Sequence, residues 1–90
     1  MEEASEVKEF ELMLDNSNNS LEVMVVTSKP GFSLRLQTST EDVLLDFRLN
    51  PNRHSYLLDT SALNQGVYWL ILRKGDQEVK RSIIQIPQCL

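Results

Sequence analysis

The sequence has one cysteine, one histidine and no apolar run long enough to cross a membrane. A single thiol, Cys89, excludes an intrachain disulfide and a cage of cysteine ligands around a metal. We interpret Cys89, which stands next to the C-terminal residue, as an idle thiol. A bilayer span needs about 20 consecutive apolar residues, so we expect no membrane-spanning segment.

The sequence also lacks an excess of positive charge. It carries 9 basic and 13 acidic side chains, for a net charge of −4 at pH 7. Lysine and arginine are scattered among acidic residues, whereas a protein that binds a nucleic-acid backbone clusters them on one surface. We therefore expect no nucleic acid among the partners.

The N-terminal segment, MEEASEVKEF, has neither the basic start nor the apolar core of a secretory signal. Two interpretations of the location follow. If Met1 is native, we expect a cytoplasmic protein; if Met1 was added to a mature domain, we expect a periplasmic or cell-surface one. Residues 1–6 are expected to form a flexible tail, and residues 7–90 a single domain.

Only three glycines and three prolines punctuate the chain, and they fall between short apolar runs. Several runs alternate apolar with polar residues, as a half-buried strand does. The runs span residues 7–14, 21–27, 32–38, 43–49, 55–61, 66–73 and 77–86. No window repeats its apolar residues with helical spacing. These features predict an all-β fold, a single immunoglobulin-like Greek-key β-sandwich of about seven strands.

Within the fourth run, Val43, Leu45, Phe47 and Leu49 are expected to share one apolar face. In the last run, Ile83 and Ile84 are adjacent, so the alternation does not decide which of them faces the core.

The pattern Leu-x-x-Gly-x-Tyr, formed by Leu63, Gly66 and Tyr68, predicts a structural corner. It resembles the tyrosine corner of Greek-key sandwiches, in which a tyrosine hydroxyl bonds to backbone a few residues upstream. Gly66 suits a positive φ or a close approach of chains at such a corner. If Tyr68 faces the core, Leu70 and Leu72 face it too.

Val67, Trp69 and Ile71 then form a stripe on the opposite face of the same strand. One interpretation is that this stripe contacts a protein partner or a second copy, since exposed tryptophan is a frequent binding anchor. The other is that the stripe is covered within the chain. The cover would come from the N-terminal segment or from the stems of long basic side chains, namely Arg35, Arg48 and Lys80.

No combination of side chains in the sequence identifies an enzyme, a cofactor or a metal site. His54, Ser55 and Asp59 have the letters of a catalytic triad, but on a strand His54 points away from the other two. One histidine without a cysteine cluster cannot make a zinc site. No calcium-loop spacing links the turn acids, which are Asp15, Glu41, Asp42 and Asp46. We therefore expect no catalytic residues, no cofactor and no metal.

The stretch LLDTSALNQGVYWLILRKGDQEVKRSIIQ combines this corner with a hydrophobic strand, a polar turn and the basic pair Lys80-Arg81. It resembles the end of the C-terminal sorting domains used by type IX secretion in Bacteroidetes, and other immunoglobulin-like domains of the same bacteria. The resemblance covers about residues 55–85 and implies a β-sandwich.

Three hypotheses of function follow. The first is a non-enzymatic immunoglobulin-like accessory or interaction domain of a bacterial surface or periplasmic protein. The second, which the resemblance implies, is a C-terminal sorting domain recognised by the type IX secretion machinery. The third is a small cytoplasmic binding protein.

Overall fold

The computed structural model describes residues 6–87, which form seven β-strands and no helix. The strands are β1 (Val7–Asp15), β2 (Ser20–Thr27), β3 (Phe32–Thr38), β4 (Val43–Arg48), β5 (Ser55–Asp59), β6 (Gly66–Lys74) and β7 (Gln77–Ile86). The all-β prediction is confirmed, and the strand ends differ from those expected by two residues or fewer. Within the described residues there is thus no helix that could span a membrane.

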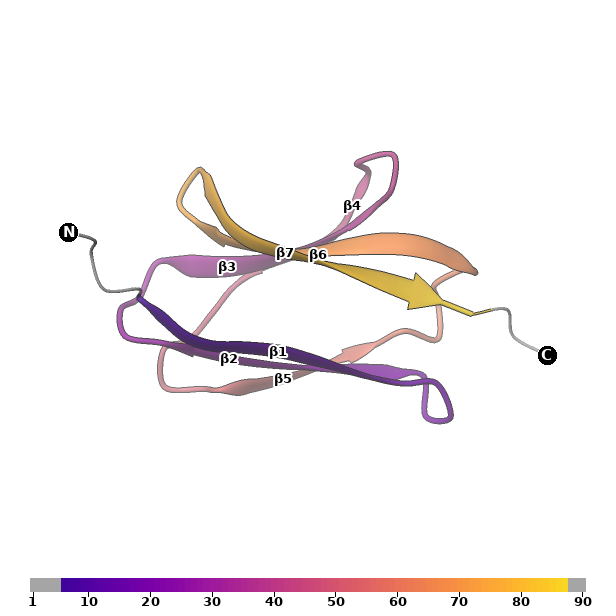
Figure 1. Cartoon of the computed structure of the whole chain (residues 1–90), viewed down its shortest axis with the longest axis horizontal. Helices are drawn as coiled ribbons and strands as arrows, with labels where there is room; N and C mark the ends of the chain where they lie inside the picture. The colour runs from indigo at the N-terminus through magenta and orange to yellow at the C-terminus, as the bar shows by residue number, and fades with distance from the viewer. Residues whose placement is uncertain (1–5, 88–90) are drawn as a thin grey trace. The chain divides into compact units, whose positions relative to one another are not determined.

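The strands make two antiparallel sheets with the orders β1-β2-β5 and β4-β3-β6-β7. Figure 1 shows β3, β6 and β7 running alongside one another, although β4 and β5 separate β3 from β6 in sequence. The pairs β2–β5 and β3–β6 are the long-range pairings that a Greek-key connection produces. Two antiparallel sheets with these pairings are consistent with the expected β-sandwich class.

Two compact parts of the chain each contain one sheet. The three-stranded sheet belongs to the unit that combines the chain up to Pro30 with Asn50–Ala62. The four-stranded sheet belongs to the unit that combines Gly31–Leu49 with the chain from Leu63 onward.

Each sheet has one buried face, because apolar and polar residues alternate along its strands. In the three-stranded sheet, Leu21, Val23 and Val25 of β2 are almost fully buried. In the four-stranded sheet, β6 is central, and its Leu70 and Leu72 have no exposed surface. Tyr68 is buried on the same side, so the expected inward face of β6 is confirmed.

The expected apolar face of the fourth run is wrong for Val43, whereas Leu45 and Phe47 lie in register with the buried Leu36 and Leu34. A β-bulge at Leu44 places Leu45 opposite Leu36 but Val43 opposite Gln37, so Val43 and Leu45 point to opposite sides of the sheet. The extra residue of a bulge reverses the alternation beyond it. As a result, three consecutive apolar side chains at the start of β4 are exposed: Val43, Leu44 and Leu45.

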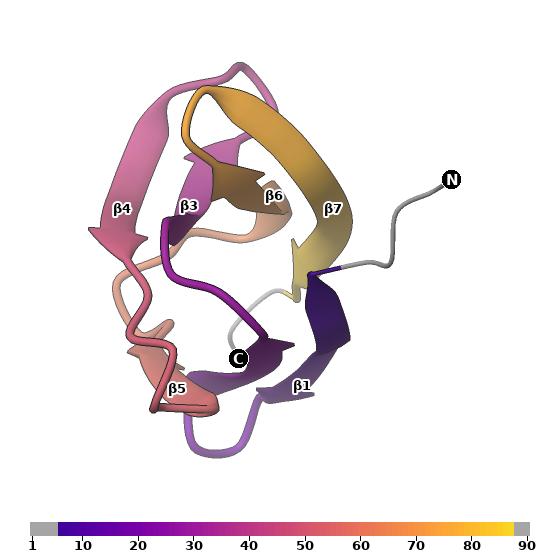
Figure 2. The same ribbon diagram turned by 90° about the vertical axis from the view of Figure 1, so that its left-hand side faces the viewer.

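The register of β7 decides between its adjacent isoleucines. Ile84 pairs with Tyr68 on the buried face, whereas Ile83 pairs with Trp69 on the opposite face and is 60% exposed. A second bulge, at Val79, separates the pair Leu72–Lys80 from the pair Arg73–Glu78. Figure 2 shows β7 and β4 at the two edges of the sheet, with β3 and β6 between them.

The fourth strand lies in a different sheet from that of constant-type immunoglobulin domains, where it pairs with the fifth strand. Here β4 pairs with β3, and the backbone N–H of Leu49 extends this pairing by donating to the carbonyl of Phe32 at 2.8 Å. The chain then turns at Pro51, which has no N–H to donate to a ladder. The Tyr56 hydroxyl holds this turn by accepting from Asn50 N at 2.8 Å and donating to Asn50 O at 3.2 Å.

Candidate functional site

The residues of the Leu63, Gly66 and Tyr68 pattern lie at the turn that leads into β6. The Tyr68 hydroxyl donates to the carbonyl of Asn64 at 2.7 Å, so it satisfies a backbone acceptor four residues upstream. Gly66 has a φ of 151°, and a side chain built there would meet nothing within 4 Å. The glycine therefore meets a conformational need rather than a close approach of chains. Leu63 is half-buried beside this turn.

Leu34, Leu70 and Leu72 lie on one side of the four-stranded sheet, and we call the other side the tryptophan face. Its apolar side chains are Val43, Val67, Trp69, Ile71 and Ile83. Its polar and charged side chains are Ser33, Arg35, Gln37, Asp46, Arg48, Arg73, Glu78, Arg81 and Gln85. Arginine outnumbers the carboxylates on this face, because the only acids in register are Asp46 and Glu78.

The structure divides the stripe Val67, Trp69 and Ile71 into three different environments. Val67 is 37% exposed, Trp69 is half-buried, and Ile71 is only 3% exposed. Ile71 lies in register between Arg35 on β3 and Arg81 on β7, whose long side chains flank it. The stripe therefore offers Val67 and part of Trp69 to a partner, but not Ile71.

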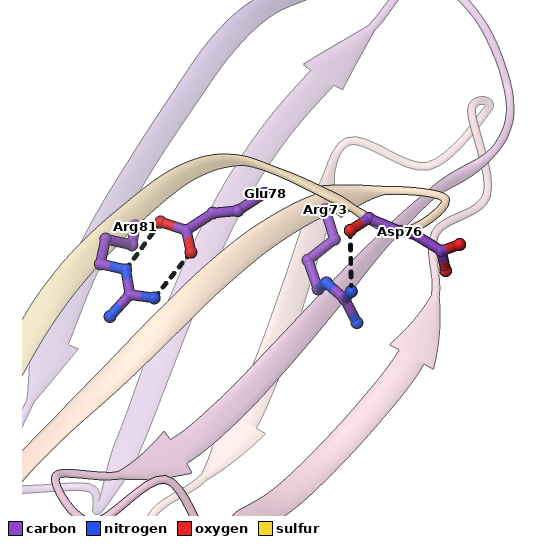
Figure 3. Close-up of polar contacts among 4 residues, drawn as sticks. All are labelled: Arg73, Asp76, Glu78 and Arg81. Carbon is purple, nitrogen blue, oxygen red and sulfur yellow. Dashed lines mark hydrogen bonds and ion pairs between the residues drawn. The ribbon is translucent and has the colours of Figure 1, made fainter.

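Arg81 covers part of the Trp69 ring. Its guanidinium carbon lies 4.8 Å from the ring centroid, within the range of a cation–π contact. The same guanidinium donates to both carboxylate oxygens of Glu78, at 2.7 and 2.6 Å (Figure 3). These bonds lower the pKa of Glu78 and raise that of Arg81, so both groups stay charged at neutral pH.

The sequence expected Lys80 rather than Arg81 among the covering side chains. Lys80 pairs with Leu72 and therefore points away from the tryptophan face. The bulge at Val79 and the pairing of Arg81 with Ile71 place Arg81, and not Lys80, on the tryptophan face. Neither feature can be predicted from the spacing of residues in the sequence.

Two other arginines of this face, Arg35 and Arg73, are held in place by local partners. Arg35 binds the carboxylate of Asp46 across β3 and β4 at 3.0 Å, and Arg73 donates to the backbone carbonyl of Asp76 at 3.3 Å (Figure 3). A hollow of about 300 Å³ lies over Ile71 and between these groups. Its lining is Arg35, Gln37, Glu41, Ile71, Arg73, Asp76, Glu78 and Arg81. Basic and acidic side chains balance in this lining, so the hollow does not form a strong anion site.

The three residues with the letters of a triad do not come together in catalytic geometry. Ser55 donates its hydroxyl hydrogen to Glu22 at 3.0 Å, and Asp59 accepts from the backbone N–H of Ser61 at 2.9 Å. His54 contributes its backbone carbonyl to Val25. Ser55 and Asp59 stand at opposite ends of β5.

The turn acids also serve local roles. Asp15 binds Ser17 and Asn18 in the β1–β2 turn, Asp46 binds Arg35, and Asp42 accepts from Thr40. Over residues 6–87, no group of three or more histidine, cysteine or acidic side chains is placed to hold a metal ion. Cys89 lies outside the described residues.

Sequence reasoning missed two apolar members of the tryptophan face, Val43 and Ile83, and its aromatic cover, Arg81. Ile83 could not be assigned because both neighbouring isoleucines suit a buried position. Val43 was assigned to the wrong face because the bulge at Leu44 has no glycine or proline to mark it.

A comparison with known protein families and with curated protein sequences found no match for this chain. The resemblance to sorting domains and the location that it implies therefore stay predictions.

Proposed function

We propose that this chain is a non-enzymatic protein-interaction domain that binds its partner through the tryptophan face. The proposal depends on one observation. On this face, Trp69 of β6 lies opposite Ile83 of β7, and the Arg81 guanidinium stacks on the indole ring. Tryptophan and arginine are the residue types most enriched among the energetic centres of protein interfaces.

The apolar part of the face is large enough to act as an anchor. Ile83 and Val43 are at least half exposed on β7 and β4, the two edge strands, and Val67 is exposed beside Trp69 on β6. Soluble proteins seldom leave several apolar side chains exposed on one face without a use. Covering them with a partner removes this apolar surface from water, which stabilises the complex.

The charge of the face indicates the chemistry of the partner. On the strands of this face, Arg35, Arg48, Arg73 and Arg81 face two carboxylates in register, so arginine exceeds carboxylate there, while Glu41 and Asp76 of the adjoining turns add two acids around the hollow. A partner with apolar side chains flanked by carboxylates matches both properties. Charged groups at the rim speed association and select the orientation more than they add affinity.

The dispersal of the triad residues supports the non-enzymatic part of the proposal. Ser55, the nucleophile candidate, is bonded to Glu22 rather than to a histidine. Nucleophilic catalysis needs a base within hydrogen-bond reach of the nucleophile, and His54 does not supply that contact.

Trp69 makes a direct test simple because it is the only tryptophan of the chain. The probe is a decapeptide of leucine and glutamate, and the control is the same peptide with lysine in place of glutamate. We expect the acidic peptide to shift the Trp69 emission to shorter wavelength in a saturable titration, and we expect the basic peptide to leave it unchanged.

Two variants complete this test. Ile83→Thr removes an exposed apolar contact and should weaken binding of the acidic peptide by about tenfold, which corresponds to roughly 1.4 kcal/mol. Val79→Thr removes an exposed apolar side chain at the β7 bulge and should leave binding unchanged. Equal titrations with the two peptides, or equal effects of the two variants, would contradict the proposal.

A further inference from the structure

The three-stranded sheet has its own exposed face, opposite Leu21, Val23 and Val25, which is named here the acidic face. Its side chains are Glu9, Glu11, Met13 and Asp15 of β1, Ser20, Glu22, Met24 and Val26 of β2, and Ser55, Leu57 and Asp59 of β5. No lysine or arginine of these strands lies in register on it. Five carboxylates therefore share one face.

The centre of the acidic face is apolar and hollowed. Met13 and Leu57 lie on either side of Glu22, and they are 65% and 69% exposed. A hollow of about 420 Å³ lies beside them and is lined by Met13, Asp15, Asn18, Ser20, Glu22 and Leu57. These two are the most exposed large apolar side chains of the described residues.

We propose that the occupant of the tryptophan face is a second copy of this chain, which docks with its acidic face. This inference rests on the proposed function, since it names the partner for the same surface. The acidic face has the chemistry required of that partner: exposed apolar side chains, Met13 and Leu57, surrounded by carboxylates.

Charge complementarity favours this pairing over contacts between identical faces. Two acidic faces in contact would bring five carboxylates against five others, and like charges across an interface weaken association. Contact between two tryptophan faces would likewise oppose arginine to arginine. The mixed contact sets strands on which arginine exceeds carboxylate against the five carboxylates of the acidic face, and it joins two apolar centres, so it relieves both problems.

Such a contact is heterologous, because each copy uses a different surface. An open assembly presents one unoccupied acidic face at one end and one unoccupied tryptophan face at the other until a ring closes. The assembly therefore grows in steps rather than stopping at a symmetric dimer.

The test uses two double variants of the full chain. Met13→Thr with Leu57→Thr disables the acidic face, and Val67→Thr with Ile83→Thr disables the tryptophan face. Threonine suits strands, and all four positions are exposed, so the fold is retained. A control variant, Leu44→Thr with Val79→Thr, removes exposed apolar side chains at the two bulges of the four-stranded sheet.

Sedimentation velocity is measured for each protein between about 10 µM and about 1 mM, a range that covers weak association. We expect the wild type and the control variant to grow with concentration, and each face variant alone to stay monomeric. A 1:1 mixture of the two face variants should form a dimer and no larger species, because it contains one intact pair of faces. Raising the salt to about 0.5 M should weaken every one of these associations.

Three results would overturn the inference: a monomeric wild type over the whole range, a face variant that assembles alone, or a mixture that stays monomeric. None of them decides the proposed function, since the peptide titration tests the tryptophan face without a second copy. Conversely, a mixture that dimerises while the peptide fails to bind would restrict the tryptophan face to self-recognition.

Discussion

The Arg81 guanidinium stacks on Trp69 at 4.8 Å while donating both of its hydrogen bonds to Glu78. One side chain thus covers the aromatic centre of the tryptophan face and is itself fixed by a carboxylate on its own strand. We expect Arg81→Ala to uncover the indole ring. Its emission should move to longer wavelength, and quenching by acrylamide should increase.

Lys80→Ala is the matched control for this measurement, because Lys80 is the adjacent cation and points to the other side of the sheet. It should leave both the emission and the quenching as in the wild type. An Arg81→Ala protein with wild-type fluorescence would show that the stacking does not persist in solution.

The buried hydroxyl of the tyrosine corner predicts a loss of stability in Tyr68→Phe. Removing it leaves the carbonyl of Asn64 without its 2.7 Å donor, and the loss of a part-buried hydrogen bond costs about 0.5–1.5 kcal/mol. Urea denaturation followed by circular dichroism measures the difference. A midpoint equal to that of the wild type would exclude the corner as a source of stability.

Ile71 and Ile83 differ in burial on the tryptophan face, so we expect their substitution by alanine to reduce stability by different amounts. Ile71→Ala should destabilise the fold by about 2–5 kcal/mol, as for other large-to-small changes at buried positions. Ile83→Ala removes a side chain that is 60% exposed and should change stability by less than about 1 kcal/mol. Comparable losses in both variants would mean that Ile83 is covered within the chain.

The β1–β2 turn predicts a dependence of stability on acid. Hydrogen bonds from Ser17 and Asn18 lower the pKa of Asp15 below its ordinary value of 3.8. Because the pKa of Asp15 is lower in the folded than in the unfolded state, its carboxylate stabilises the fold at any pH above the unfolded-state pKa. This contribution disappears as the pH falls through the folded-state pKa.

The comparison of wild type with Asp15→Asn isolates this effect. The wild type should be the more stable protein at pH 6, and the difference between their urea midpoints should vanish well below pH 3.8. If the difference in stability were the same at every pH, it would come from the altered hydrogen bonds of asparagine and not from the charge of Asp15.

The positive φ of Gly66 predicts that any L-residue is strained at this position. Gly66→Ala should cost about 1–3 kcal/mol, although the added methyl group meets no neighbour. Gln65→Ala, at the adjacent exposed position, is the control and should be close to neutral. A stable Gly66→Ala protein would show that the backbone relaxes at the start of β6.

Most of the fold could be predicted from the sequence because its strands obey simple alternation between short polar turns. The inward set Tyr68, Leu70 and Leu72 follows from period two alone. The face of Val43 could not be predicted, since the bulge at Leu44 depends on the register with β3. A bulge of this kind is fixed by pairing and not by composition.

The candidate site was predictable only in part, for a related reason. Trp69 and Val67 were assigned to the correct side of β6, whereas the burial of Ile71 depends on long side chains from two neighbouring strands. The second hydroxyl contact, from Tyr56 to Asn50, has no motif comparable to Leu-x-x-Gly-x-Tyr. These features depend on contacts between strands, which cannot be predicted from the spacing of residues along one strand.

The strand order has a consequence for how the chain folds. The hairpins β1–β2, β3–β4 and β6–β7 close over short loops, whereas β2–β5 and β3–β6 must bring distant segments together. Folds dominated by such distant pairings fold slowly, on the order of milliseconds to seconds. We expect the hairpins to form early and the contact between Leu34 and Leu72 to limit the rate, so truncating either side chain should slow folding more than truncating Val25.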